Sequence, residues 1–275
     1  MKRLILFLLL AFASTGLSRG QDRITEALNA IKSLDHKQII VVPHRGLWGT
    51  PGVPETSLKA IQECYEAGYM FCETDLVLTK DKQLLLSHDM QLNRTTDAPP
   101  TFSTYGGVID PGNFFRSLNY YTTTDNSVPD PNGNLYPSFP ALKDLHYKDR
   151  FGNVTDQNLN TFEEALSFCQ GKEIILALDV KAVNMTDPVI KDEYFEIFKM
   201  AIELASEHKM LHQVIFKPGS SGQVIAGELK AYLEGSGVWD EFTHRLILCL
   251  SILSAMHFLW LRINSIWMGG SQYRL

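Results

Sequence analysis

The segment that decides the fold is residues 38–77, QIIVVPHRGLWGTPGVPETSLKAIQECYEAGYMFCETDLV. It begins with Gln38 to Pro43, a β-branched apolar run of the kind found in a buried strand. Residues 55–67 then repeat apolar side chains with the period of a helix, and Gly68 follows at the position favoured after a helix C-terminus. A second apolar strand is expected from Met70 to Val77. A strand, a helix and a strand in this order predict a unit of parallel sheet.

The same alternation continues to about residue 233 and predicts an α/β protein, built as a barrel or as a doubly wound sheet. Residues 97–140 interrupt it with Pro, Gly, Asn, Ser and Thr over a length unusual for a simple connection, so we expect an insertion or lid there. A capping-box pattern from Thr161 to Glu164 opens one of the helices. Further strands are expected at 84–88, 173–181 and 213–217, and further helices at 161–168, 192–208 and 222–233.

The composition is that of an ordinary globular protein, with 45% hydrophobic and 20% charged residues in a chain of 275. That length suits one large α/β domain or two small ones. The formal net charge is −6, whereas proteins that bind the nucleic-acid backbone usually carry a basic surface. We therefore expect no nucleic-acid partner.

Residues 1–20 have the pattern of a secretory signal peptide. Lys2-Arg3 precede an apolar run from Leu4 to Ala13, and small residues follow. The apolar run is shorter than the ~20 residues that a membrane-spanning helix needs, so we expect a secreted or periplasmic protein with no stable membrane anchor. Residues 21–37 carry apolar side chains at helical spacing, which predicts an amphipathic helix ahead of the main domain.

Two acidic residues in the strand 70–77 predict a metal site. Side chains alternate along a strand, so Glu73 and Asp75 point to the same face. Two carboxylates on one face of a buried strand repel each other and lose hydration unless a cation or a donor lies between them. Ligands that are all oxygen favour Mg²⁺ or Ca²⁺. The alternative is an exposed edge strand with two solvated acids, and the apolar neighbours argue against it.

The strand 173–181 carries a second pair of charged residues, Asp179 and Lys181, which share one face. They could form a simple buried ion pair. If the strand lies in the same parallel sheet, its carboxyl end brings Asp179 to the metal site and Lys181 to a substrate phosphate. The two interpretations are compatible.

His44 and His88 each end an expected strand. One histidine in such a place is usually a core residue, but two of them beside a metal site favour acid and base catalysis, because imidazole titrates near neutrality. Arg45 carries a guanidinium fork that fits two phosphate oxygens. Cleavage of a phosphodiester needs one group to deprotonate the nucleophile and another to protonate the leaving alkoxide. These residues therefore predict chemistry on a phosphate ester.

A series of short motifs in a fixed order carries a family resemblance. The motifs are H-R-G at 44–46, P-E-T at 54–56, E-T-D at 73–75, T-K-D at 79–81, H-D at 88–89, R-T-T at 94–96, T-F-E-E-A-L at 161–166 and L-D-V-K at 178–181. Several motifs in the right order are far more specific than any one alone. In them the chain resembles the glycerophosphodiester phosphodiesterases of the PLC-like phosphodiesterase superfamily.

The resemblance implies a TIM (β/α)8 barrel whose site lies at the carboxyl ends of the strands. It implies one divalent cation, Ca²⁺ or Mg²⁺, and a small-molecule glycerophosphodiester substrate that is hydrolysed to glycerol 3-phosphate and an alcohol. His44 and His88 resemble the family's acid–base pair, and Arg45 and Lys181 resemble its phosphate-binding residues.

The resemblance also implies three metal ligands, Glu73, Asp75 and Asp179. Asp179 stands where the family commonly has glutamate, so its side chain is one methylene shorter. A water molecule could fill the difference.

The chain after residue 242 departs from the family pattern. Residues 243–275 are largely apolar and resemble none of the strands that would complete a barrel. We expect the barrel domain to run over residues 38–242 and to be incomplete at its C-terminal end, as in a truncated or frame-altered product. This tail supports one alternative to the hydrolase, an inactive binding protein derived from a barrel. Another alternative is a phospholipase-D-like enzyme of the same superfamily that uses paired histidines on lipid headgroups, but the H-R-G and R-T-T motifs favour the hydrolase.

Overall fold

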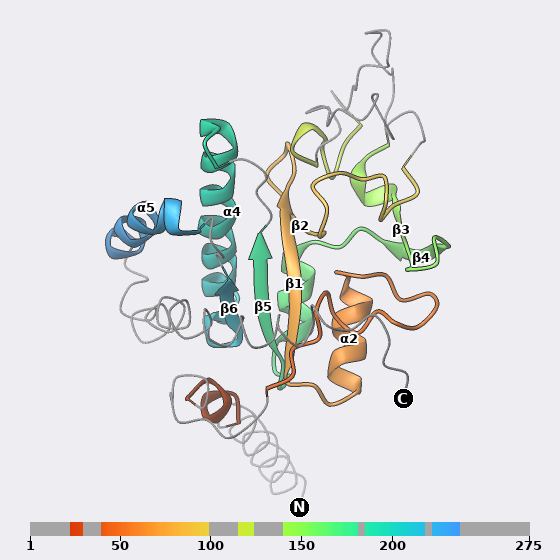
Figure 1. Cartoon of the computed structure of the whole chain (residues 1–275), viewed down its shortest axis with the longest axis horizontal. Coiled ribbons are helices and arrows are strands. Elements are labelled where there is room, and N and C mark those ends of the chain that lie inside the picture. The colour runs from red at the N-terminus through yellow and green to blue at the C-terminus, as the bar shows by residue number, and fades with distance from the viewer. Residues whose placement is uncertain are drawn as a thin grey trace, which may run out of the picture.

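A four-stranded sheet forms the centre of the structure (Figure 1). The computed structural model describes residues 23–29, 40–98, 115–123, 140–180, 185–217 and 222–236. The strand order is β2-β1-β5-β6. In this sheet β1 (Phe71–Leu78), β5 (Ile175–Val180) and β6 (Val214–Lys217) run parallel, and β2 (Leu84–Leu86) runs antiparallel to β1. The predicted α/β class with a parallel sheet is confirmed.

The two faces of this sheet differ in chemistry, because side chains alternate along each strand. One face is apolar, with residues such as Cys72 and Leu176 side by side in the register and buried in the main core. On the other face, Asp75 of β1 pairs in register with Asp179 of β5, which pairs in register with Lys217 of β6. One side of the sheet therefore supplies the hydrophobic core and the other supplies a row of charged groups.

Helices contribute buried residues to the same core as the apolar face of the sheet. The rings of Phe198 and Phe216, for example, have centroids 6.0 Å apart and join a helix to β6. In the residues that the structure describes, no helix is long and apolar enough to cross a bilayer. After a helix at residues 23–29, the α-helices of the described residues are α2 (Leu58–Glu66), α3 (Phe162–Cys169), α4 (Pro188–Glu207) and α5 (Gly222–Gly235).

The helices α2, α3 and α4 each begin after a residue whose side chain caps the helix N-terminus. Ser57 caps α2 by accepting a hydrogen bond from the backbone of the third residue beyond it. Thr161 and Glu164 form the capping box predicted for the start of α3, which is confirmed. Asp187 caps α4, and Pro188 lies in the first turn, where its missing N–H costs nothing.

Two of the expected strands differ from the prediction. Residues 40–43 form no strand, although Pro43 O accepts a hydrogen bond from Glu73 N at 3.0 Å and so joins this segment to β1. The strand β2 ends at Leu86 and not at His88. It is antiparallel to β1 because the short turn between them cannot make the crossover of a dozen or more residues that parallel strands need.

An antiparallel hairpin of β3 (His146–Lys148) and β4 (Val154–Asn158) was not predicted from the sequence. Most of its residues are polar, so it lacks the apolar alternation by which strands are recognised. Tyr147 ties the hairpin to the sheet by donating from its hydroxyl to Leu86 O at 2.7 Å. Short 3-10 helices lie at Phe115–Ser117 (η3), Leu142–Asp144 (η4) and Leu211–Gln213 (η5).

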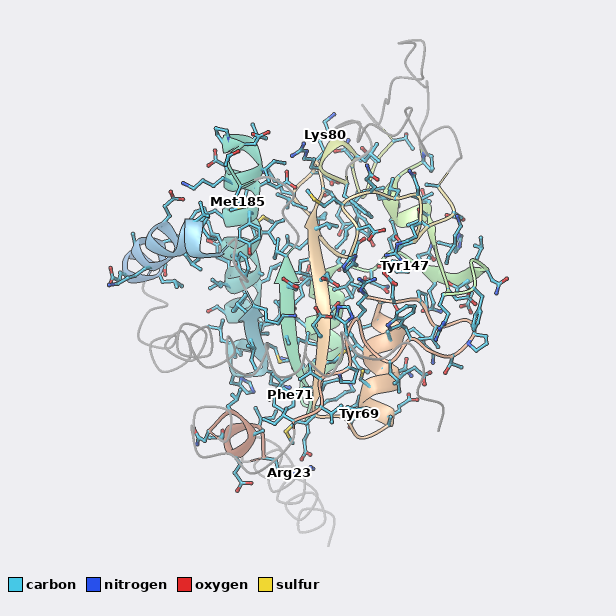
Figure 2. The ribbon with its side chains drawn as sticks, viewed as in Figure 1. Arg23, Tyr69, Phe71, Lys80, Tyr147 and Met185 are labelled. Atoms are coloured by element: carbon cyan, nitrogen blue, oxygen red, sulfur yellow. The ribbon has the colours of Figure 1, made fainter. Side chains whose placement is uncertain are left out.

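Residues 23–29 form a helix ahead of the sheet, and Ile24 is buried in the main core. Figure 2 shows Arg23 and Phe71 toward one end of the molecule and Lys80 toward the other, so β1 points away from the N-terminal helix. The expected signal peptide, most of the insertion, and the tail 243–275 lie outside the described residues. The predicted incompleteness of the barrel stays a prediction for that reason.

Candidate active site

The loop His44-Arg45-Gly46 is built around a glycine that no other residue can replace without strain. Arg45 and Gly46 have φ angles of 61° and 79°, in the left-handed region. A Cβ on Gly46 would lie 2.6 Å from the Cβ of Ala60 in α2. Leu47 N donates to Ala60 O at 3.2 Å. The loop is therefore held directly against the helix that follows it.

The same loop is bonded to the carboxylates of β1. Arg45 N donates to Glu73 Oε2 at 2.7 Å. Thr56 N donates to Arg45 O at 2.9 Å, and Thr56 Oγ1 donates to Asp75 Oδ2 at 3.2 Å. The acidic residues of the strand thus fix the backbone around the histidine and arginine as well as forming a group of their own.

Glu73, Asp75 and Asp179 lie together, each with an oxygen atom within 4.8 Å of the others. Glu73 and Asp75 are only 2% and 0% exposed, and the side chain of Asp179 is 18% exposed. Three carboxylates so poorly hydrated need positive charge close by. Their oxygen atoms suit a hard divalent cation. The three residues therefore fit a metal site, and metal coordination by them stays a prediction.

Lys217 is a neighbour of this group that the sequence patterns did not reveal. Its Nζ lies 3.2 Å from Glu73 Oε1 and 3.6 Å from Asp179 Oδ2. The sequence predicts a strand ending at Lys217, but only the pairing of β6 with β5 sets this lysine beside Asp179. Lys181, the lysine implied by the family resemblance, lies outside the described residues.

His88 has a carboxylate at one ring nitrogen and a guanidinium at the other. Nδ1 lies 2.7 Å from Asp89 Oδ1, and Nε2 lies 2.7 Å from Arg45 Nη2. A guanidinium can only donate, so Nε2 must accept and Nδ1 must carry the proton that is donated to Asp89. The ring is therefore neutral, with its lone pair on Nε2.

Glu55 and Arg94 complete a network around His88. Arg45 Nη1 donates to Glu55 Oε1 at 3.0 Å, and Arg94 Nη2 donates to the same oxygen at 2.5 Å. Arg94 Nε also donates to Asp89 Oδ2 at 2.7 Å. The two arginines are thus bridged by one buried carboxylate.

The network controls the charge of its members. Burial favours the neutral form of Asp89, but hydrogen bonds from His88 and Arg94, together with the positive charge of Arg94, hold its pKa well below the usual range. Hydrogen bonds to Asp89 and Glu55 raise the pKa of Arg94, against the effect of burial. Arg94 and Glu55 fall in the motifs R-T-T and P-E-T, which marked them in the sequence but gave them no role.

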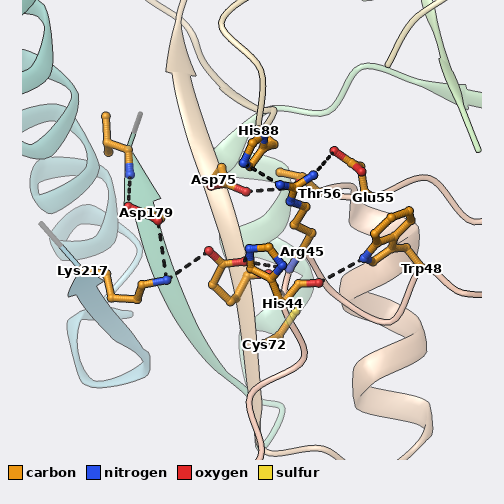
Figure 3. Close-up of polar contacts among 12 residues, drawn as sticks. His44, Arg45, Trp48, Glu55, Thr56, Cys72, Asp75, His88, Asp179 and Lys217 are labelled. Atoms are coloured by element: carbon orange, nitrogen blue, oxygen red, sulfur yellow. Dashed lines mark hydrogen bonds and ion pairs between the residues drawn. The ribbon is translucent and has the colours of Figure 1, made fainter. Parts of the chain in front are cut away.

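His44 lies at the exposed side of the site. Its side chain is 44% exposed, and its Nε2 lies 4.0 Å from Glu73 Oε2. Trp48 Nε1 donates to His44 O at 3.1 Å and steadies the backbone there. In the view of Figure 3, His44 and His88 lie on one side of β1 and Asp179 lies on the other.

The arrangement can bind an anion and move protons next to it. Arg45 offers a guanidinium whose buried Nε makes no hydrogen bond to any described residue, so it has capacity for a further acceptor. His88 has a lone pair on Nε2 that now accepts from Arg45, and His44 has an accessible imidazole. With a cation at the carboxylates, these groups would surround a phosphate ester with positive charge and two proton carriers.

Comparison with known proteins agrees with this chemistry. A family model described as the glycerophosphoryl diester phosphodiesterase family matches residues 44–225. The chain is 26% identical over 202 residues to "Glycerophosphodiester phosphodiesterase 1" of Rattus norvegicus. The matched residues make up 72% of this chain and 50% of the rat protein. It is 27% identical over 193 residues to the protein of the same name from Homo sapiens, and the matched residues make up 70% of this chain and 48% of the human protein. The chain spans about half the length of these curated relatives.

The chain is also similar to solved structures. One is a glycerophosphodiester phosphodiesterase from Parabacteroides distasonis, with 19% identity and a TM-score of 0.43 over 64% of this chain and 54% of that one. At this TM-score the structural likeness adds nothing to the match in sequence.

Proposed function

The chain belongs to the glycerophosphoryl diester phosphodiesterase family, and from that premise we propose that it hydrolyses glycerophosphodiesters to glycerol 3-phosphate and an alcohol. The observation that carries the proposal is the group of three carboxylates, Glu73, Asp75 and Asp179, gathered on adjacent parallel strands. The loop bearing Arg45 is bonded directly to this group. A small-molecule diester is accordingly the expected partner.

The proposed enzyme depends on one divalent cation, Mg²⁺ or Ca²⁺, held by the three carboxylates. All three offer oxygen ligands, which these ions prefer. The cation would neutralise charge that gathers on the phosphate oxygens. Near-complete burial of Glu73 and Asp75 supports this assignment, because the family's ion would supply the charge that solvent cannot.

Arg45 and the two histidines are the proposed groups for phosphate binding and proton transfer. A phosphate that draws the Arg45 guanidinium toward itself would free Nε2 of His88 to accept a proton. Asp89 holds the opposite nitrogen of that ring, so His88 keeps its orientation while the proton moves. His44 is the proposed partner in proton transfer, because its partly exposed ring is accessible to substrate.

Lys181 is proposed as a second phosphate-binding residue. It follows Asp179 by two positions in the L-D-V-K motif, so a strand continued to residue 181 would turn both side chains to the same face. This assignment rests on the family resemblance together with that spacing.

We also propose that the protein is exported to the periplasm or the cell exterior. The support is the basic and then apolar pattern of residues 1–20. Mass spectrometry of the mature N-terminus from an expressing cell tests the proposal, since cleavage near residue 20 is expected and an intact Met1 in the exported fraction would contradict it.

The hydrolase proposal is tested with the purified full chain and glycerophosphocholine, in the presence of Ca²⁺ or Mg²⁺. We expect cation-dependent release of glycerol 3-phosphate, and a loss of at least about 100-fold in kcat for His44→Ala, the usual scale for a lost acid or base. His208→Ala is the matched control, because His208 is the C-cap residue after α4 and contacts Glu163. Equal rates for the two variants, or no glycerol 3-phosphate from any glycerophosphodiester in a panel of headgroups, would overturn the proposal.

A further inference from the structure

We propose that Lys217 is a built-in counter-cation of the carboxylate group, which a divalent ion must displace from Glu73 and Asp179 in order to bind. The inference rests on the proposed function, in which that group holds the ion. It assigns to a residue of β6 a role that the family motifs do not contain, since none of them reaches residue 217. Lys217 would set how tightly the site holds its metal.

The position of Lys217 follows from the sheet and does not depend on a chance surface contact. Asp179 and Lys217 are paired in register on adjacent parallel strands, so their side chains leave the same face. The Lys217 ammonium lies 3.2 Å from Glu73 Oε1 and 3.6 Å from Asp179 Oδ2. It therefore occupies space between two of the three residues that a cation would bridge.

The charges favour competition between a divalent ion and the Lys217 ammonium. Three negative charges lie within 4.8 Å of one another on Glu73, Asp75 and Asp179. Lys217 places one positive charge beside them. A divalent ion binds hard oxygen ligands at about 2.0–2.6 Å, so it would compete with the ammonium for the carboxylates of Glu73 and Asp179. The ion and the ammonium would also repel each other at such short range.

The lysine side chain is suited to being displaced. Its ammonium is a strongly hydrated point charge on a flexible four-carbon stem, and its side chain is 25% exposed. The ammonium can therefore move toward solvent while the stem stays against the sheet. Arginine would be harder to release, because its planar fork can hold a carboxylate with two hydrogen bonds.

The test measures cation affinity of the full chain by calorimetry with Ca²⁺ and with Mg²⁺. Lys217→Met removes the charge and keeps the length of the stem, and we expect it to bind the cation at least about tenfold more tightly than the wild type. Lys217→Arg should bind it no more tightly than the wild type. Lys230→Met is the matched control for net charge, because Lys230 is exposed on α5 and pairs with Glu234; its affinity should equal that of the wild type.

An equal or weaker affinity of Lys217→Met for both ions overturns the inference. That result leaves the proposed function untouched if the wild type still hydrolyses its substrate in a cation-dependent way. Absence of cation binding in every variant, with no hydrolysis, would instead count against the proposed function itself.

A second measurement uses the wild type alone and does not depend on the folding of a variant. An amine-acetylating reagent is applied with and without Ca²⁺, and peptide mass spectrometry follows labelling at Lys217 and at Lys230. Displacement predicts that Ca²⁺ raises the labelling of Lys217 several-fold and leaves Lys230 unchanged. Unchanged or reduced labelling of Lys217 on addition of an ion that binds would contradict the displacement.

Discussion

Two acidic groups lie on either side of the same loop, and they differ in how their charge is matched. Glu73, Asp75 and Asp179 form one group, and Glu55, His88 and Asp89 form the other; in each, the candidate ligand atoms lie within 4.8 Å of one another. By geometry alone both could hold a metal ion. Their surroundings separate them.

The negative charge of the second group is already neutralised by arginine side chains of the protein. Its two carboxylates, Glu55 and Asp89, are held by the guanidinium groups of Arg45 and Arg94, and His88 joins as a neutral ring. The first group contains three carboxylates and receives an ammonium from Lys217. Charge matching, and not the number of acidic ligands, therefore distinguishes a proposed cation site from a network that orients side chains.

The largest expected effect comes from Asp75→Asn, which removes a charge from the first group and keeps an oxygen that can accept from Thr56. Outer-shell changes at metal sites cost about 10–100-fold in affinity, so loss of a ligand should weaken cation binding by at least about 100-fold. The rate of diester hydrolysis should fall by about 1,000-fold or more. In cation-free buffer the free energy of unfolding should rise by about 1 kcal/mol, because repulsion among buried carboxylates is relieved.

The matched variant in the second group is Asp89→Asn. It removes the acceptor charge of an ion pair with Arg94, so cation-free stability should fall and cation affinity should stay near that of the wild type. Urea titrations and calorimetry on both variants give the comparison. If both substitutions changed cation-free stability in the same direction, the distinction between the two groups would be lost.

Gly46→Ala is expected to affect both groups, because the loop joins them, and to reduce cation binding and hydrolysis less than Asp75→Asn does. The new Cβ would lie 2.6 Å from that of Ala60, at a φ of +79°. Left-handed strain of about 1–2 kcal/mol and overpacking of about 1–3 kcal/mol give an expected loss of about 3 kcal/mol in the free energy of unfolding. Cation affinity and hydrolysis should both decline, since Arg45 contacts both groups.

Gly68→Ala is the control for strain alone. Gly68 follows α2 with a φ of +82°, but a Cβ added there would have no neighbouring atom within 4 Å. Its substitution should therefore cost only about 1 kcal/mol and should leave cation affinity unchanged. Equal losses in the two variants would show that the contact with Ala60 does not matter.

The first group was largely predictable from the sequence, and the reason is periodicity. Alternation along one strand already set Glu73 and Asp75 on one face, and the apolar run around Asp179 predicted a second buried strand. The position of Asp179 beside them was conditional on the two strands lying in one parallel sheet, and the pairing of β1 with β5 meets that condition. The capping box at Thr161 was equally readable, because its hydrogen bonds are local in sequence.

The partners that decide how each group is charged were not predictable in this way. Lys217 reaches Glu73 across 144 positions, and Arg94 reaches Glu55 across 39. Such contacts depend on register and loop path, which no period in the sequence encodes. The motifs marked Arg94 as part of a family pattern, but its function as a bridge between Glu55 and Asp89 emerges only in the folded chain.

The smallest expected effect is the pH dependence of the second group. The pKa of Asp89 lies well below its usual value in the folded protein, since hydrogen bonds from His88 and Arg94 and the positive charge of Arg94 outweigh the effect of burial. A carboxyl group with a depressed folded pKa contributes stability that is complete above its unfolded pKa of about 3.9 and is lost as pH falls toward the folded value. Because Arg94 is half exposed, solvent screening limits the contribution to about 1 kcal/mol.

The difference in free energy of unfolding between the wild type and Asp89→Asn should therefore be constant from about pH 7 to pH 5 and should shrink below about pH 4. Urea titrations of both proteins across this range measure it, and a difference that changed mainly between pH 7 and pH 5 would mean that a histidine, and not Asp89, controls the stability of the network.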